Sequence, residues 1–342
     1  MSGKPPFRSL VTVLLPLLML LAGCGGGATL QPPGPGPATP QLDGDFVTAE
    51  DGYRLPLWHW SPDGDAPDAI VLAVHGFNDH GGSFDVLAAA LTEHNIAVYA
   101  YDQRGFGVTR QRRLWAGHQR MVDDIDLLAR LLRERHPETP LYLVGKSMGG
   151  ALVMLAMSRD TPPPVDGSVL IAPAVWGQEA MPWYQRASLW LAVRLIPDTA
   201  FSARTAERLG IEPTDDPEIM AKLAKDARIL RSARVDTLYG VTQAMDRALE
   251  SAADLPGPTL LLYGDNDQVI PPEAMCALLE RLPERRQAAW RLALYPDGYH
   301  MLTRYTQRQR TEADIAAWLK APSAALPSGS EVSLPEAQQA LC

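Results

Sequence analysis

A serine between two glycines, in the pentapeptide Gly-Lys-Ser-Met-Gly at residues 145–149, is the strongest chemical signal in this chain. An apolar run at 141–144 precedes it, and a run typical of a helix follows at 151–157. A strand, a tight turn and a helix are the context in which such a serine presents its hydroxyl at the end of a sheet. The pattern therefore predicts Ser147 as a nucleophile, against the alternative of a small-residue structural turn. A phosphate-binding loop is excluded, because it needs a glycine where Pro140 stands.

A serine hydroxyl needs a base to take its proton and a carboxylate to orient that base. One class of hydrolases orders these groups along the chain as serine, acid and histidine. Of the seven histidines, only His300 follows Ser147. It stands on a loop directly after the strand-like run 290–295. We therefore expect His300 to be the base.

The acid should stand at the end of the strand before that one. The apolar run 259–263 leads into a loop that contains both Asp265 and Asp267. Asp267 lies deeper in the loop and just before apolar residues, so its carboxylate is the better placed to turn inward. Asp265 follows Gly264 and is typical of a turn former. The residues favour Asp267 and leave Asp265 as the alternative.

Two backbone N–H groups should receive the negative oxygen of a tetrahedral intermediate. One is expected from Met148, the residue after the nucleophile, and the other from Phe77, in the loop after an early apolar strand. We interpret His75, Asp79 and His80 as residues that shape this loop rather than as ligands. The chain has no H-E-x-x-H and no C-x-x-C motif, so we expect neither a metal nor an organic cofactor.

The ordered motifs resemble the monoacylglycerol lipase and lysophospholipase branch of the α/β-hydrolases, which overlaps the serine aminopeptidase-like hydrolases. The resemblance covers about residues 46 to 320, and it implies an α/β-hydrolase fold with a triad on Ser147, Asp267 and His300. Family members often carry histidine where this chain has Lys146 and Phe106. The residues that carry the resemblance are His75-Gly76, Asp79-His80, Asp102–Gly107, Gly145–Gly150, Gly264, Asp267 and His300.

The elements that must position these residues alternate between strand-like and helix-like runs. The strand-like runs are nearly continuously apolar, as expected for a mostly parallel central sheet with helices on both faces. Residues 121–132 have an apolar helical face, and residues 46–60 predict an antiparallel entry hairpin around Asp51-Gly52. We therefore predict one α/β domain over residues 46–320. The predicted strands cover 69–74, 96–101, 140–144, 168–172, 259–263 and 289–295.

The alternation breaks over residues 175–255, which carry several helical patterns and no clear strand. We interpret this segment as a helical cap inserted over the serine. Trp183 and Trp190 lie on a broad apolar surface within it. Ordinary packing of cap on core explains part of that surface, and we expect the rest, with these two tryptophans, to line an acyl-chain tunnel.

The first 23 residues predict a secretory signal. Lys4 and Arg8 precede an apolar segment at 10–21, which is too short to span a membrane as a helix. The sequence Leu-Ala-Gly-Cys that ends at Cys24 resembles the lipobox of bacterial lipoproteins, which implies cleavage before Cys24 and a lipid on its sulfur. We expect a protein of the bacterial cell envelope, anchored through this lipid. In an organism with two membranes, Gly25 after the cysteine favours the outer membrane, facing the periplasm.

Two segments flank the predicted domain. Residues 24–45 are rich in glycine and proline, which is typical of a flexible-to-extended linker. Residues 321–342 are rich in serine, proline and alanine and are expected to be a disordered tail. An oxidising compartment permits a bond between Cys276 and Cys342, but we expect Cys276 to be buried and free, because it falls in a helical run while Cys342 is terminal.

The formal net charge of −9 gives no support to nucleic-acid binding. The sequence does not predict an oligomeric state. We expect a serine ester hydrolase that acts on monoacylglycerols or lysophospholipids as small-molecule substrates. One alternative is a serine aminopeptidase of short peptides, and a second is a non-catalytic binding lipoprotein. The aminopeptidase needs an acidic recess in the cap, for which the candidates are Glu179, Asp198, Glu207, Asp215 and Asp216.

Overall fold

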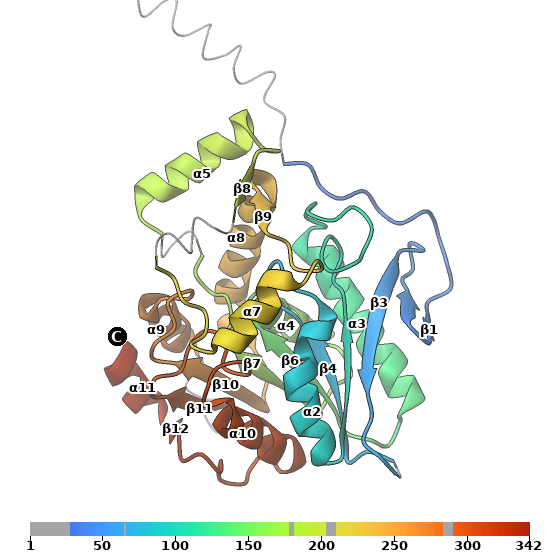
Figure 1. The fold of residues 1–342 in the computed structure, drawn as a ribbon, viewed down its shortest axis with the longest axis vertical. Helices are drawn as coiled ribbons and strands as arrows, with labels where there is room; N and C mark the ends of the chain where they lie inside the picture. Colours follow the sequence, from blue (N-terminus) through green and yellow to red (C-terminus); the bar gives the residue numbers. More distant parts are fainter. Residues whose placement is uncertain (1–27, 65, 178–180, 203–209, 283–289) are drawn as a thin grey trace, which may run out of the picture.

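A single large sheet runs through the protein in the computed structural model (Figure 1). The structure describes residues 28–64, 66–177, 181–202, 210–282 and 290–342. Within these ranges, ten strands pair in the order β1-β2-β3-β5-β4-β6-β7-β10-β11-β12. Their bounds are β1 (Gln41–Asp43), β2 (Phe46–Thr48), β3 (Arg54–Trp60), β4 (Ala69–Val74), β5 (Ile96–Tyr101), β6 (Leu141–Lys146), β7 (Gly167–Ile171), β10 (Thr259–Gly264), β11 (Trp290–Tyr295) and β12 (Glu331–Val332).

The central strands β5, β4, β6, β7, β10 and β11 pair in parallel, and the outer strands are antiparallel. The apolar runs predicted as strands form these parallel strands, with ends that differ by at most two residues. The predicted hairpin also forms, as β2 and β3, with Thr48 opposite Arg54. The prediction of a mostly parallel α/β sheet is confirmed.

Helices cover both faces of the sheet, because alternate residues of each strand point to opposite sides. Ile70 and Leu72 of β4 pack into the core under α3, α4, α8 and α9, whereas Val71 packs into the core under α2 and α10. Two single turns, η1 (Gly81–Phe84) and η2 (Ser251–Asp254), connect elements. The helices are α2 (Asp85–Glu93), α3 (His118–Arg135), α4 (Met148–Met157), α5 (Trp183–Leu195), α7 (Pro217–Lys225), α8 (Val235–Glu250), α9 (Pro272–Arg281), α10 (Arg308–Lys320) and α11 (Leu334–Leu341).

The inserted segment between β7 and β10 differs from the predicted helical cap in two ways. It contains a small antiparallel sheet, formed by β8 (Ala200–Ser202) and β9 (Ser232–Arg234). Its last helix, α8, belongs to the main body, since residues such as Ala244 and Ala248 are fully buried in the core beside α4. The cap proper therefore consists of α5, β8, α7 and β9 (Figure 1).

The predicted free linker is wrong over its described part. Residues 28–43, which we call the strap, lie along the body. The Gln31 N–H donates to the Trp115 carbonyl at 2.8 Å, and the Gln31 side chain is buried. The Gly34 N–H donates to the Asp51 carboxylate at 2.8 Å, and β1 then pairs with β2. The amino-acid composition of the strap did not predict this arrangement, because the strap is held by backbone hydrogen bonds that a proline- and glycine-rich chain can still make.

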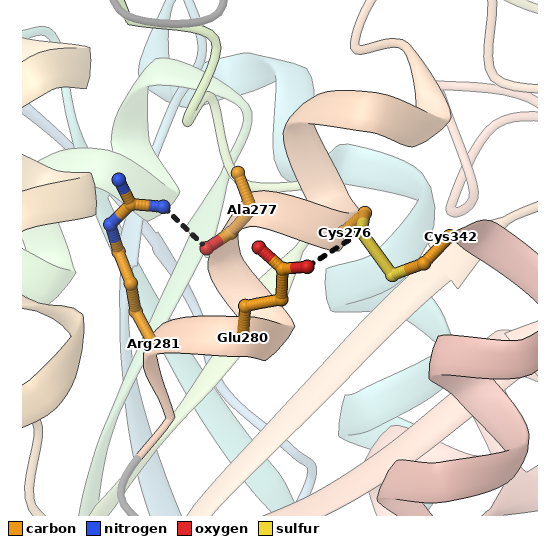
Figure 2. Close-up of a disulfide and its surroundings, with 5 residues drawn as sticks. All are labelled: Cys276, Ala277, Glu280, Arg281 and Cys342. Carbon is orange, nitrogen blue, oxygen red and sulfur yellow. Dashed lines mark hydrogen bonds between the residues drawn. A yellow bond between two sulfur atoms is a disulfide. The ribbon is translucent and has the colours of Figure 1, made fainter.

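The predicted disordered tail is also wrong. Strand β12 pairs with β11, and α11 begins with a capping box in which Ser333 and Glu336 exchange hydrogen bonds. Cys276 of α9 is not free, because it forms a disulfide with Cys342, as Figure 2 shows. Helix α11 gains its stability from this cross-link and from packing on α9. Its weak apolar periodicity therefore did not predict that it is ordered.

None of the described helices is both long enough and apolar enough to cross a membrane.

Candidate active site

The predicted nucleophile stands on a strained turn between β6 and α4. Ser147 has φ 53° and ψ −122°, a conformation that a residue with a side chain rarely adopts. Its N–H donates to the Ile171 carbonyl at 3.0 Å, and its carbonyl accepts from the Ala174 N–H at 2.9 Å. Glycine is needed beside it, since a β-carbon at Gly145 would lie 2.6 Å from the Gly149 oxygen. The turn is therefore fixed by the elements around it.

The predicted base and acid are in contact. The Nδ1 hydrogen of His300 donates to Oδ2 of Asp267 at 2.8 Å. The other oxygen of Asp267 accepts from the Val269 and Ile270 N–H groups, at 2.8 and 2.9 Å. The Asp267 side chain is fully buried and that of His300 is 10% exposed. The carboxylate is thus held in place from both sides, and it fixes the imidazole with Nε2 free to accept a proton.

The competing acid has a different place. Asp265 is exposed, and its Oδ1 accepts from the Asp297 N–H at 2.7 Å. That contact ties together the loops after β10 and β11. The structure therefore pairs His300 with Asp267 and leaves Asp265 in a turn.

Ser147 and His300 both line one cavity of about 360 Å³. Among the hydrogen bonds that the described residues form, none joins the Ser147 hydroxyl to His300. Such bonds are commonly long or misaligned without substrate and shorten when it binds. The structure thus brings the three side chains to one place and completes only the His300–Asp267 bond.

Both predicted oxyanion donors lie close to Ser147. A β-carbon on Gly76 would lie 3.2 Å from the Ser147 β-carbon, so the loop that carries Phe77 passes close to the serine. Phe77 lines the cavity, and Met148 is the first residue of α4, where helix N–H groups lack intrahelical acceptors. In the part of the chain that the structure describes, neither backbone N–H is paired with a protein acceptor.

His75 shapes the oxyanion loop, as the sequence indicated. It is fully buried, with its Nδ1 hydrogen donated to the Gly76 carbonyl at 2.8 Å. Its Nε2 accepts from the Gln103 N–H at 3.0 Å, and the Gln103 side chain donates to the His75 carbonyl at 2.7 Å. Burial lowers the pKa of His75 to about 4. The imidazole is therefore neutral at pH 7, and its tautomer is set by these contacts.

A charged cluster in the cavity wall was not expected from the sequence. The Lys146 ammonium lies 2.7 Å from Oδ2 of Asp79 and donates to the Ser83 hydroxyl at 2.6 Å. Arg304 lines the same cavity. Asp79 shapes the loop, as predicted, but it also faces the cavity, and its Oδ1 is buried with no hydrogen-bond partner among the described atoms.

Charge interactions decide the protonation of this cluster. Burial would raise the pKa of Asp79, but Lys146 and Arg304 outweigh burial and hold that pKa well below its usual range. Burial lowers the pKa of Lys146, and the Asp79 carboxylate opposes this. His80 faces elsewhere, with Nε2 at 3.1 Å from Asp226. The cavity wall therefore carries a buried ion pair next to the nucleophile.

Other walls of the cavity are apolar, and they come from both the cap and the body. Leu223 belongs to α7, Ile229 follows it, and Val269 and Met301 come from the loops after β10 and β11. Trp183 and Trp190 do not line this cavity, because their side chains are 74% and 52% exposed on α5. The described residues thus give no support to the acyl tunnel that we expected these two tryptophans to line.

The acidic recess of the aminopeptidase alternative does not form from the described candidates. Asp198 is exposed, Asp215 accepts from the Thr306 N–H at 2.9 Å, and Asp216 caps α7. None of the three lines the cavity, while Glu179 and Glu207 lie outside the described residues, as does the predicted lipid site.

A family model places the chain among known proteins. The model for serine aminopeptidase, S33, matches residues 65–307, which is most of the chain. The chain belongs to the serine aminopeptidase S33 family. Curated relatives of this S33 protein include a monoacylglycerol lipase of Mycolicibacterium smegmatis, 27% identical over 78% of this chain and 93% of the relative. A monoglyceride lipase of Rattus norvegicus is 26% identical over 77% of this chain and 85% of that protein.

Solved structures share the fold of this S33 protein. The monoglyceride lipase of Saccharomyces cerevisiae, solved with a substrate analogue, aligns with a TM-score of 0.68 at 20% identity, over 84% of this chain and 96% of that one. The monoacylglycerol lipase of Paleococcus ferrophilus aligns with a TM-score of 0.63 at 23% identity, over 79% and 99%. These alignments show the α/β-hydrolase fold.

Proposed function

We propose that this chain cleaves the ester bond of monoacylglycerols or lysophospholipids through Ser147, Asp267 and His300. The chain is a carboxylic ester hydrolase. The observation that carries the proposal is the His300–Asp267 hydrogen bond, made at the cavity where Ser147 stands on its strained turn. A base oriented by a buried carboxylate, in the same cavity as a serine hydroxyl, is the arrangement that nucleophilic acyl transfer needs.

Each step of the reaction has a group to perform it. The Ser147 hydroxyl attacks the ester carbonyl while His300 Nε2 takes its proton. The tetrahedral oxyanion is received by the Phe77 and Met148 amides, whose N–H groups have no protein acceptor among the described residues. His300 then protonates the departing alcohol, which leaves an acyl-enzyme. Water repeats the same steps on the acyl-enzyme and releases the fatty acid.

The lining of the cavity supports the substrate class. Apolar side chains such as Leu223 and Met301 suit an acyl chain, and the charged side chains of Lys146 and Asp79 suit a polar alcohol. The printed names of the relatives agree with this class.

The proposal extends to the place of action. Cleavage before Cys24 and a lipid on its sulfur would anchor the enzyme in the bacterial cell envelope, in the outer membrane facing the periplasm where two membranes exist. The Cys276–Cys342 disulfide supports an oxidising compartment such as the periplasm.

A substrate panel tests the proposed activity. Monoacylglycerols, lysophospholipids and aminoacyl amides are compared by kcat/KM with the full-length protein in detergent. We expect the two lipid classes to be turned over at least about 100-fold better than the amides, because the described cap acids do not line the cavity. Preference for the amides would favour the aminopeptidase. Absence of turnover for all three, with a folded protein, would contradict ester hydrolysis.

A further inference from the structure

One helix of the cap exposes far more apolar surface than the rest of the protein. Of the thirteen residues of α5, only Val193 is buried. We call the exposed large apolar and aromatic side chains of α5 and β8 the cap face. Isolated exposed apolar residues are ordinary, but a contiguous set marks a surface that binds something. The cap face consists of Trp183 (74% exposed), Tyr184 (54%), Trp190 (52%), Leu191 (49%), Leu195 (54%) and Phe201 (51%).

The strap begins beside this surface. The Thr29 N–H donates to the Asp236 carboxylate at 3.2 Å, and the Asp236 N–H donates to the Pro197 carbonyl at 2.9 Å, two residues after α5 ends. Asp236 also binds Arg234, which pairs with Ala200 of β8. The start of the described chain therefore lies against the base of the cap, at the same end of the molecule as α5 (Figure 1).

Because the strap is bound to the body, only the residues before it can separate a lipid anchor on Cys24 from the protein. Cys24 precedes Ala28 by four residues. A fully extended chain spans at most about 3.6 Å per residue, so these four reach about 14 Å. With the lipid anchor of the proposed function, on which this step rests, the cap face would be held close to the lipid headgroups.

The chemistry of α5 suits a lipid surface. Tryptophan and tyrosine favour the boundary between headgroups and acyl chains, because their rings are apolar and their N–H and O–H groups are polar. In a protein of net charge −9, α5 carries Arg186 and Arg194 and no acidic residue. Arg194 lies over the Trp190 ring, 3.8 Å from its centre. Cations on an apolar helix attract anionic headgroups.

We propose that the cap face docks on a phospholipid bilayer, with Trp183 and Trp190 at the level of the headgroups. Docking places the cap, which supplies part of the cavity wall through α7, against the membrane that holds the substrate. The anchor and the cap face thus act as two attachments that fix the orientation of the enzyme.

Fluorescence quenching tests the orientation. The full-length protein is reconstituted in vesicles of phosphatidylethanolamine and phosphatidylglycerol (3:1) that contain a phospholipid brominated along its acyl chain. We expect the brominated lipid to quench the parent protein, and W183F/W190F to lose at least about half of that quenching, because the other tryptophans lie off the cap face. The proposal would be overturned if the brominated lipid did not quench the parent, or if it quenched the double variant equally.

A second variant tests the consequence for activity. W183S/W190S/L195S should hydrolyse monoacylglycerol in vesicles at least threefold more slowly than the parent, and should hydrolyse the soluble ester p-nitrophenyl butyrate at the parent rate, which also shows that it is folded. Equal rates on vesicles would overturn docking. Cross-links between α5 helices of two copies, in a parent that is not quenched, would make the cap face a contact between copies instead. Absence of p-nitrophenyl butyrate hydrolysis by the parent would refute the proposed hydrolase activity. The quenching result would still decide whether the cap face docks on the bilayer.

Discussion

At the residue scale, the two carboxyl groups of the loop after β10 differ in their partners. Asp267 holds His300 and accepts two backbone N–H groups, whereas Asp265 holds only a neighbouring loop. An asparagine at position 267 can accept the backbone N–H groups, but its amide NH₂ would then face His300 and favour the wrong imidazole tautomer. Asp267 is thus needed because its carboxylate is charged and offers only acceptor atoms to His300.

D267N should therefore lower kcat for p-nitrophenyl butyrate by about 10³ to 10⁴. D265N is the matched control, and we expect it to stay within about threefold of the parent, because its carboxylate contacts neither His300 nor the cavity. Steady-state kinetics on both variants measures this. If D265N loses as much activity as D267N, the assignment of the acid is incorrect.

The buried pair next to the nucleophile predicts a second residue-scale result. The side chains of Lys146 and Asp79 are 15% and 13% exposed. K146M leaves the Asp79 carboxylate without its closest cation and should lower the free energy of unfolding by about 3 kcal/mol. K146M/D79N removes the isolated charge and should recover more than half of that loss. Urea unfolding measures both variants, and a double variant no more stable than K146M would contradict the pairing.

At the element scale, the sequence predicted those elements that carry their own apolar pattern. The runs of β4 and β5 match the structure residue for residue. The strap and α11 were misjudged, because each is stabilised by partners distant in sequence: Gln31 by Trp115, and Cys342 by Cys276. The local amino-acid composition does not identify partners that are distant in sequence. Ser147, Asp267 and His300 could be found because motif and chain order identify them. The cluster of Lys146, Asp79 and Arg304 arises only when the end of β6 and two loops converge.

The loop after β4 gives a pH prediction. Folding lowers the pKa of His75 from its ordinary 6.5 to about 4, because burial disfavours the charged form. Between these values the unfolded chain binds the proton and the folded chain does not. Stability contributed by neutral His75 is therefore complete above pH 6.5 and is lost as the pH falls to about 4, by about 3 kcal/mol in total.

Urea unfolding of the parent and H75N at pH 7 and pH 4.5 measures this effect. H75N does not titrate at this position, so its stability should fall less between the two pH values than that of the parent. An equal fall in both proteins would show that His75 is not the group responsible.

The C-terminal elements give a second element-scale prediction. The disulfide closes a loop of 66 residues and ties α11 to α9. C276S/C342S should lower the free energy of unfolding by about 2–4 kcal/mol, because the unfolded chain regains the freedom that the cross-link removed. Denaturation of the parent with and without dithiothreitol is the matched control. Unchanged stability in the double variant would contradict a stabilising role for this bond.

At the scale of the whole molecule, the sheet, the cap and the strap have separate tasks. The sheet brings the loops after β4, β6, β10 and β11 to one edge, where they form the cavity. The cap closes part of that cavity with α7 and exposes α5 on its outer side. The strap joins the N-terminal segment to the base of the cap. The start of the strap and the cap thus lie at the same end of the protein (Figure 1).

The central claim is that Ser147, His300 and Asp267 act together as one nucleophilic unit, and a fluorophosphonate reacts only with a serine activated in this way. Mass spectrometry of the labelled full-length protein should find the phosphonyl group on Ser147 alone. S147A should take up no label and should lose about four to six powers of ten in kcat on p-nitrophenyl butyrate. Label on another serine, or near-parent turnover by S147A, would contradict the account.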